Sequence, residues 1–312
     1  MSFEKLNALG KEQIPFLCIS DFLGENIKVF PLDTLQKEDI EFCMDANYTY
    51  KEHPHSFMMQ PVDFQTYKQK FEKVIEKIQS GETYILNLTQ ATKIQTPLSL
   101  KEVYALANAH YKLRFKDKFV CFSPEQFISI EENTIHTYPM KGTIDASIKN
   151  AEAKILANTK EMAEHVMIVD LLRNDLSIVA KEVKVEKFRY TQSIDAGDKK
   201  LLQVSSHISG KLPSNWHENI GNILKNLLPA GSISGAPKKS TVSIIKSIEG
   251  YERDYFSGIF GFYDGVKFDS GVMIRFIEKN KDGYIYKSGG GITLDSEATL
   301  EYNELQEKIY LP

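Results

Sequence analysis

Apolar residues recur at every third or fourth position in several stretches of the chain, and this spacing is typical of amphipathic helices. The pattern predicts helices over residues 64–79, 151–176 and 219–227. The second helix keeps one acidic and polar face and becomes apolar from Val166 onwards, so we expect its far end to be buried. A further helix near the C-terminus is predicted to be capped at Asp295 or Ser296.

Between these helices lie runs rich in β-branched and aromatic residues, which indicate strands. The runs cover residues 14–19, 27–30, 83–92, 118–130, 134–139, 183–190, 201–209, 258–263, 271–277 and 283–288. The last three are expected to form an antiparallel meander that closes at Gly289-Gly290-Gly291. The pattern therefore predicts the α+β class, with a single domain of large antiparallel sheets flanked by helices over 61–312 and a short N-terminal extension, 1–60, packed on its core.

Composition narrows the class of protein. The 312 residues are 42% hydrophobic with a net charge of −4, and the basic residues are scattered, so we expect no nucleic-acid partner. The three widely spaced cysteines argue against zinc and disulfides and favour the reducing cytoplasm. No apolar run approaches the roughly 20 residues of a membrane helix, so no membrane partner is expected. The element His53-Pro54-His55 is expected to be a loop rather than a metal site.

Two acidic pairs at a spacing of three residues are the first sign of chemistry. Glu161 and Glu164 project from one helical face, and Glu301 and Glu304 from another, with Lys308 one turn further along. Carboxylates that faced one another would repel unless a cation lay between them, and oxygen ligands favour Mg²⁺. Two solvated helix faces are the alternative.

Other candidates are ambiguous when they are considered one at a time. The loop 228–239, rich in glycine and serine, could hold an anion on free N–H groups or be a structural turn. Lys141 could be a desolvated nucleophile or a solvated side chain, and Glu125 a general acid or a turn residue. Arg275 differs, since a charge on an apolar strand must be paired or must meet a ligand carboxylate.

Taken together, six motifs resemble the chorismate-utilising enzymes from about residue 65 to the end. The motifs are Glu-Thr-Tyr-Ile-Leu-Asn-Leu-Thr (82–89), Ser-Pro-Glu (123–125), Pro-Met-Lys-Gly-Thr (139–143), the run from Glu161 to Asp175, Gly-Ser-Ile-Ser-Gly-Ala-Pro-Lys (231–238), and Gly-Gly-Gly-Ile (289–292) with the helix of Glu301, Glu304 and Lys308. Lys141 is similar to the lysine of Pro-Ile-Lys-Gly-Thr in aminodeoxychorismate synthase component I, where anthranilate synthases usually carry a small residue.

The resemblance implies a chorismate-binding catalytic domain over 61–312 and a role for each candidate. It implies Mg²⁺ held by Glu164 and Glu304, with Glu161 and Glu301 in support. It also implies that Lys141 is the nucleophile and Glu125 the general acid. The implied substrate-binding residues are Arg275, Gly289, Gly290, Lys308, Ser232, Thr143 and Gln203. The expected reaction converts chorismate and ammonia, supplied by a glutamine amidotransferase subunit, to 4-amino-4-deoxychorismate for 4-aminobenzoate and folate synthesis.

Three positions qualify this expectation. Ile85 stands where water-adding relatives place a lysine base, which disfavours water addition. Gln203 stands where many relatives have a histidine, and His207 lies roughly 13 Å further along the expected strand.

The alternatives to the expected function are anthranilate synthase component I, against which Lys141 argues, and a catalytically silent chorismate-binding regulator. Because the N-terminal region is short, feedback by tryptophan is not expected.

Overall fold

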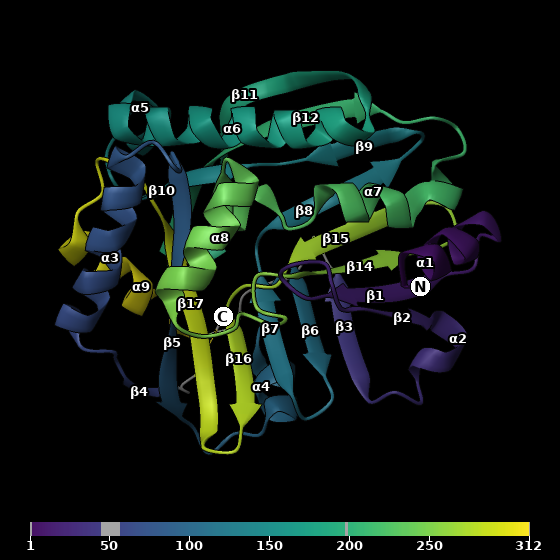
Figure 1. The fold of residues 1–312 in the computed structure, drawn as a ribbon, viewed down its shortest axis with the longest axis horizontal. Coiled ribbons are helices and arrows are strands. Elements are labelled where there is room, and N and C mark those ends of the chain that lie inside the picture. Colours follow the sequence, from purple (N-terminus) through teal and green to yellow (C-terminus); the bar gives the residue numbers. More distant parts are fainter. Residues whose placement is uncertain (1, 45–56, 197–198, 312) are drawn as a thin grey trace.

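The computed structural model describes residues 2–44, 57–196 and 199–311 of the chain (Figure 1). The helices are α1 (Ser2–Lys11), α2 (Leu32–Leu35), α3 (Phe64–Gln79), α4 (Leu100–Leu106), α5 (Ala151–Ala157), α6 (Thr159–Val179), α7 (Ile220–Leu227), α8 (Lys238–Glu249) and α9 (Ala298–Glu307), with 3₁₀ turns η1 (Trp216–Asn219) and η2 (Gly231–Ile233). The element His53-Pro54-His55 lies outside the described residues, so its expected loop stays a prediction.

The described strands form two sheets, and every pairing is antiparallel. The first has the order β10 (Met140–Asp145), β12 (Lys199–Lys211), β9 (Thr134–Thr137), β8 (Gln126–Glu131), β15 (Phe268–Val272), β14 (Ile259–Tyr263), β1 (Phe16–Ser20) and β2 (Ile27–Pro31), with β11 (Lys181–Ala196) paired to β12. The second has the order β13 (Gly235–Ala236), β5 (Ile85–Gln95), β17 (Gly283–Ile292), β16 (Phe276–Asn280), β7 (Phe119–Ser123), β6 (Tyr111–Phe115) and β3 (Ile40–Met44), with β4 (Met58–Gln60) paired to β5. The predicted α+β fold of large antiparallel sheets flanked by helices is confirmed.

The chain passes between the two sheets at neighbouring points. One crossing lies at Pro124-Glu125, between β7 and β8, and the other at residues 273–275, between β15 and β16. Two single strands, 118–130 and 271–277, had been predicted here, and both predictions are wrong at these breaks. The strands on both sides of each break are apolar and largely buried, so hydrophobicity alone does not reveal that they belong to different sheets, although Ser123-Pro124-Glu125 has the composition of a turn.

The N-terminal residues, expected to pack on the core as an extension, contribute to both sheets. Strand β1 lies between β14 and β2 in the first sheet, and β3 forms an edge of the second. Helix α1, for which the sequence analysis made no prediction, packs against α7 and η1, with Leu6 buried. The boundary proposed at residue 60 stays a prediction.

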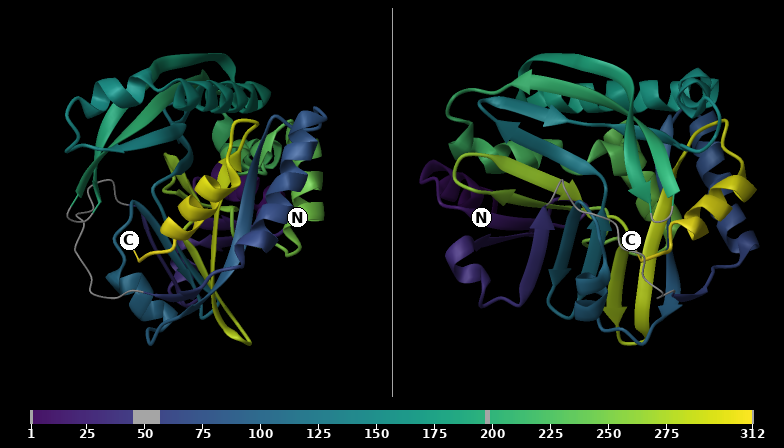
Figure 2. Two further views of the ribbon diagram at one scale, coloured as in Figure 1. Left: turned by 90° about the vertical axis from the view of Figure 1, so that its left-hand side faces the viewer. Right: turned by 180° about the vertical axis from the view of Figure 1, so that it is seen from behind.

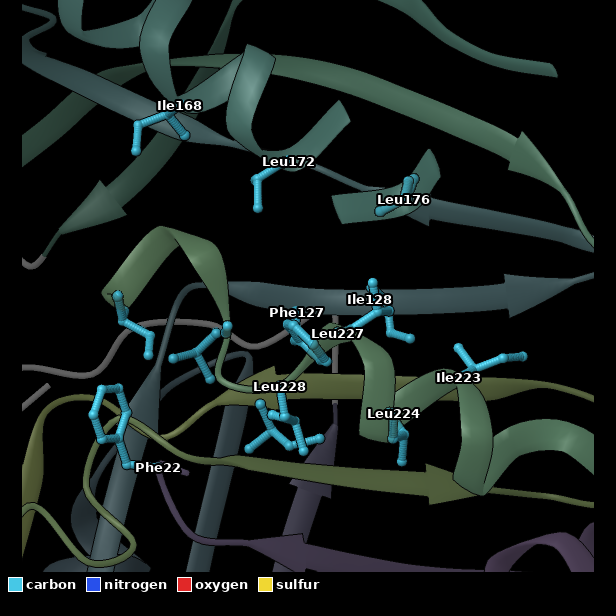
Figure 3. Packing of buried hydrophobic residues seen from close by; sticks show 14 of the residues in the cluster. Phe22, Phe127, Ile128, Ile168, Leu172, Leu176, Ile223, Leu224, Leu227 and Leu228 are labelled. Atoms are coloured by element: carbon cyan, nitrogen blue, oxygen red, sulfur yellow. The ribbon is translucent and has the colours of Figure 1, made fainter. Parts of the chain in front are cut away.

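Helices cover the sheets on separate sides. Helices α5 and α6 run beside β11 and β12, whereas α3, α8 and α9 lie beside β5 and β17, as the two views of Figure 2 also show. On α6, Ile168, Leu172 and Leu176 recur at intervals of four residues and are buried. Figure 3 shows these three side chains facing β8 and α7, in the largest apolar cluster of the described residues. The predicted burial of the far part of this helix is confirmed.

Two helix boundaries differ from the prediction. The expected helix over 151–176 is interrupted at Asn158, whose side chain accepts a 3.1 Å hydrogen bond from the N–H of Glu161 and so caps α6. The C-terminal helix begins at Ala298 after Glu297, so neither Asp295 nor Ser296 caps it. Ser296 instead donates a 2.8 Å hydrogen bond to the carboxylate of Glu301, which holds that side chain in place. Within the described ranges, no helix is both long and apolar enough to cross a membrane.

Candidate active site

A cavity opens where the two sheet crossings meet the glycine-rich loop and the C-terminal helix. The predicted residues that line it are Glu125, Lys141, Gln203, Ser232, Arg275, Gly289, Gly290 and Lys308. They come from seven separate parts of the sequence, so the fold brings the predicted motifs together in one site. Thr143 is an exception, because it is exposed on β10 and does not line this cavity.

The two acidic helix faces meet beside this cavity. Nζ of Lys141 lies 2.7 Å from Oε2 of Glu164 on α6, and Nζ of Lys308 lies 2.7 Å from Oε1 of Glu304 on α9. Burial raises the pKa of Glu161, and the charge of Glu164 raises it further, although Lys141 opposes this effect. Burial likewise raises the pKa of Glu301, as does neighbouring Glu304, against the hydrogen bond from Ser296. The charge of Glu304 on α9 also raises the pKa of Glu161 on α6, so the carboxylates of the two helices act on one another.

This arrangement fits Mg²⁺ in its donor chemistry. All four side chains offer oxygen, and Oε2 of Glu161 is buried without a hydrogen-bond partner among the described residues. Over the same ranges, no three acidic, histidine or cysteine side chains converge into a ready-made metal site. Lys141 and Lys308 instead satisfy part of the negative charge, so binding of a cation would require these two ammonium groups to release the carboxylates.

The protonation of Lys141 is set by two opposing effects. Burial lowers its pKa, as the sequence analysis expected for a nucleophile, but the ion pair with Glu164 and the charges of Glu304 and Glu161 outweigh burial and leave the pKa raised. The ammonium form therefore predominates while these carboxylates are otherwise unneutralised.

Glu125 lies at the first sheet crossing and has the opposite balance. Burial raises its pKa, and the hydrogen bond from Ser232 and the charges of Arg275 and Lys308 only partly oppose this. A carboxyl group with a raised pKa keeps its proton to higher pH, which suits a proton donor. Its backbone is fixed, since its N–H donates to Oγ of Ser123 at 3.0 Å.

Arg275 lies at the second crossing with a left-handed backbone, φ +50°. This conformation ends β15 and turns the chain into β16, so Arg275 is not inside a continuous strand as expected. Its Nε is buried and has no hydrogen-bond partner among the described residues. An unpartnered buried donor on a cation suits an anionic ligand.

The glycine run forms part of β17 rather than a closing loop. Gly289 pairs with Thr89 of β5, and a Cβ atom there would lie 2.5 Å from Cγ2 of that threonine. At Gly290 a Cβ atom would lie 3.4 Å from Oε2 of Glu301 and 3.6 Å from Nζ of Lys308. Because Gly289 and Gly290 have no side chains, their backbone forms this part of the cavity wall and leaves room for a ligand.

Gln203 lies in the cavity, and two histidines lie near it in the sequence or the fold. Gln203 lines the cavity, and its Oε1 is buried without a partner among the described residues. His207 lies away from the cavity and pairs with His136 at 3.0 Å, so it does not replace a histidine at position 203. His165 is buried next to Glu164, with Nε2 2.7 Å from Oγ of Ser206, and burial lowers its pKa to about 4.

A buried ion pair that the sequence pattern does not reveal holds one wall of the cavity. Arg253 donates to the carbonyl oxygens of Ile233 at 2.9 Å and Asn87 at 2.6 Å, both in residues that line the cavity. Its Nη2 also lies 2.6 Å from Oε1 of Glu249, which accepts a 2.8 Å bond from the N–H of Thr89. Glu249 ends α8, and Arg253 follows four residues later. This spacing is typical of ion pairs, but such pairs are common on exposed helix faces, so the sequence does not indicate that this one is buried.

Comparison with known proteins identifies the family of this chain. A family model described as chorismate binding enzyme matches residues 36–311. The "Uncharacterized PabA-like protein" of Haemophilus influenzae is 47% identical over 99% of this chain and 95% of its own length. "Aminodeoxychorismate synthase component 1" of Salmonella typhimurium is 32% identical over 78% of this chain, and the match spans 56% of that protein.

A solved structure shows the same fold. Anthranilate synthase component I from Streptococcus pneumoniae superposes with a TM-score of 0.68 and 23% identity, over 98% of this chain and 78% of that one. At this identity the likeness supports the fold alone. The match of the family model to most of the chain shows that the protein belongs to the chorismate binding enzyme family.

Proposed function

We propose that this protein is an aminodeoxychorismate synthase component I, which converts chorismate and ammonia to 4-amino-4-deoxychorismate for 4-aminobenzoate and folate synthesis in the cytoplasm. The observation that carries the proposal is the position of Lys141. Its ammonium group lines the same cavity as Glu125 and Arg275 and lies 2.7 Å from Glu164. An amine in that place can react with the ring of a bound substrate, whereas a small residue could not.

Each group then has a role in binding. The guanidinium of Arg275 and the backbone of Gly289 and Gly290 receive the enolpyruvyl carboxylate. Glu164 and Glu304 would hold Mg²⁺, with Glu161 and Glu301 in support. When bound, this ion supplies positive charge that neutralises the acidic side chains and attracts the ring carboxylate.

The reaction follows from the two titratable groups. Lys141, freed from the negative charge of Glu164, loses its proton to solvent, and its amine attacks C2 of the ring. The ring double bonds shift, the bond from C4 to the hydroxyl oxygen breaks, and Glu125 delivers its proton so that water departs. Ammonia then attacks C4, the double bonds shift back, and the bond from C2 to Lys141 breaks, which leaves Lys141 as a neutral amine. The ammonium group formed at C4 returns one proton to the carboxylate of Glu125. The net change is chorismate plus ammonia to the 4-amino product plus water.

We further propose that a glutamine amidotransferase subunit supplies the ammonia. The similarity to aminodeoxychorismate synthase component 1 supports this proposal. High ammonium concentration bypasses the need for that subunit in a test.

Product analysis tests the proposed function. Purified protein is incubated with chorismate, Mg²⁺ and concentrated ammonium at mildly alkaline pH, and aminodeoxychorismate lyase is then added. Formation of 4-aminobenzoate only after the lyase is added is the expected result. Anthranilate formed without the lyase would overturn the assignment in favour of an anthranilate synthase, and absence of turnover would favour a chorismate-binding regulator.

A further inference from the structure

The residues that follow helix α9 form a short segment, 308–311, beside the cavity, which Lys308 itself lines. Figure 1 shows the C-terminal end of the chain beside β16 and β17. Strand β17 holds α9 and this segment through three hydrogen bonds. Ser288 donates to the carbonyl oxygen of Leu305 at 3.0 Å, Lys308 to that of Gly289 at 2.8 Å, and Tyr286 to that of Tyr310 at 3.2 Å.

Apolar packing holds the end of the same segment. Leu311 is 8% exposed and belongs to the apolar cluster that contains Tyr286, and Ile309 packs against that cluster. The segment therefore has a defined position relative to the glycine run of β17, although the Tyr310 side chain itself is 45% exposed.

Tyr310 contacts the guanidinium of Arg275. Cζ of Arg275 lies 5.5 Å from the centre of the Tyr310 ring, within the range of a cation–π interaction. Nε of Arg275 has no hydrogen-bond partner among the described residues, so the Tyr310 ring restrains the guanidinium and leaves this donor free for a ligand.

We infer that Tyr310 is a positioning residue that directs Arg275 toward the enolpyruvyl carboxylate of chorismate. This inference rests on the proposed function, because that function assigns the carboxylate to Arg275. The aromatic ring restricts the guanidinium to one orientation, so less conformational entropy is lost when the carboxylate binds. Tyr310 thus favours ligands that carry a carboxylate on the side chain at C3 over ligands that carry only the ring carboxylate.

The test compares two ligands by titration calorimetry. One is chorismate, and the other is trans-3,4-dihydroxycyclohexa-1,5-diene carboxylate, which has the ring carboxylate but no enolpyruvyl group. For Tyr310→Leu we expect the dissociation constant of chorismate to rise about threefold to fivefold, on the scale of a cation–π contact with a partly exposed ring, and that of the ring analogue to stay unchanged. Tyr310→Phe retains the ring and should leave both dissociation constants unchanged.

Tyr302→Leu is the matched control. Tyr302 lies on α9, donates a 2.6 Å hydrogen bond to the carbonyl oxygen of Val62 and does not line the cavity. We expect it to lower the melting temperature without changing the ratio of the two dissociation constants. An unchanged ratio in Tyr310→Leu, or a change of the same size in Tyr310→Phe, would overturn the inference. Failure of the wild-type protein to bind chorismate would instead overturn the proposed function, and product identity does not enter this measurement.

Discussion

The backbone N–H of Val272 donates a 3.1 Å hydrogen bond to the carbonyl oxygen of Glu125, which joins the two points where the chain passes between the sheets. The proposed general acid, Glu125, and the proposed carboxylate ligand, Arg275, therefore lie on segments that are close to each other. The backbone bond from Val272 holds the backbone of Glu125 in place.

This placement predicts the effect of removing the acid. Glu125→Gln preserves the shape of the side chain and lacks the carboxyl proton, so we expect the rate of 4-amino product formation to fall by about 10² to 10⁴. Chorismate affinity should change little. Steady-state kinetics combined with calorimetry measures both quantities, and a rate within a factor of three of wild type would exclude the acid role.

The pH profile offers a second prediction. Since Glu125 must be protonated, activity should fall as the pH rises through its raised pKa. The hydrogen bond from Ser232 favours the ionised carboxylate, so Ser232→Ala should raise the pKa further and move this alkaline limb to higher pH. Profiles of kcat against pH for the wild-type protein and Ser232→Ala test the direction of this shift. An alkaline limb displaced to lower pH in the variant would contradict the role of Glu125 as the acid.

Lys141 can be tested with its charge retained. Lys141→Arg keeps a cation beside Glu164, but a guanidinium does not lose its proton near neutral pH. We expect at least about a hundredfold loss of amination, on the scale of a lost catalytic group, for both Lys141→Arg and Lys141→Ala. Wild-type rates in Lys141→Ala would eliminate the nucleophile role, and anthranilate from that variant would identify Lys141 as the determinant of specificity.

Binding of Mg²⁺ should be visible without turnover. An ion that binds only the folded protein, at a hundredfold excess over its dissociation constant, stabilises it by about 2.7 kcal/mol. We expect Mg²⁺ to raise the melting temperature of the wild-type protein and not that of a Glu164→Gln, Glu304→Gln double variant. Glu72→Gln, which alters an exposed glutamate of α3, is the control that should respond as wild type does.

The buried pair of Glu249 and Arg253 predicts a large loss of stability. Arg253→Met leaves Glu249 buried without its cation, and breaking such a pair costs about 3–5 kcal/mol in the free energy of unfolding. Arg173→Met breaks an exposed pair with Asp170 and should cost less than about 1 kcal/mol. Denaturant unfolding of both variants makes the comparison, and similar losses would show that burial of the pair is unimportant.

The sequence predicted the class of fold and most residues of the cavity because periodicity and ordered motifs are local properties. It did not predict that the chain changes sheet at Glu125 and Arg275, since the flanking strands are apolar and a local pattern does not reveal which sheet a strand joins. The predicted helix cap at Ser296 was also wrong, because its hydroxyl donates a hydrogen bond to the carboxylate of Glu301 instead of capping the helix. The balance of charges on Lys141 depends on Glu161 and Glu164 of α6 and on Glu304 of α9, so no local pattern could reveal its raised pKa.

The neighbouring crossings have a mechanical consequence. A ligand held between Glu125 and Arg275 contacts both segments where the chain passes from one sheet to the other, so it links these segments. Separating the two sheets would then require the ligand contacts to break as well as the hydrogen bond from Val272 to Glu125. The force needed to unfold a single molecule should consequently report whether the cavity is filled, even where no reaction takes place.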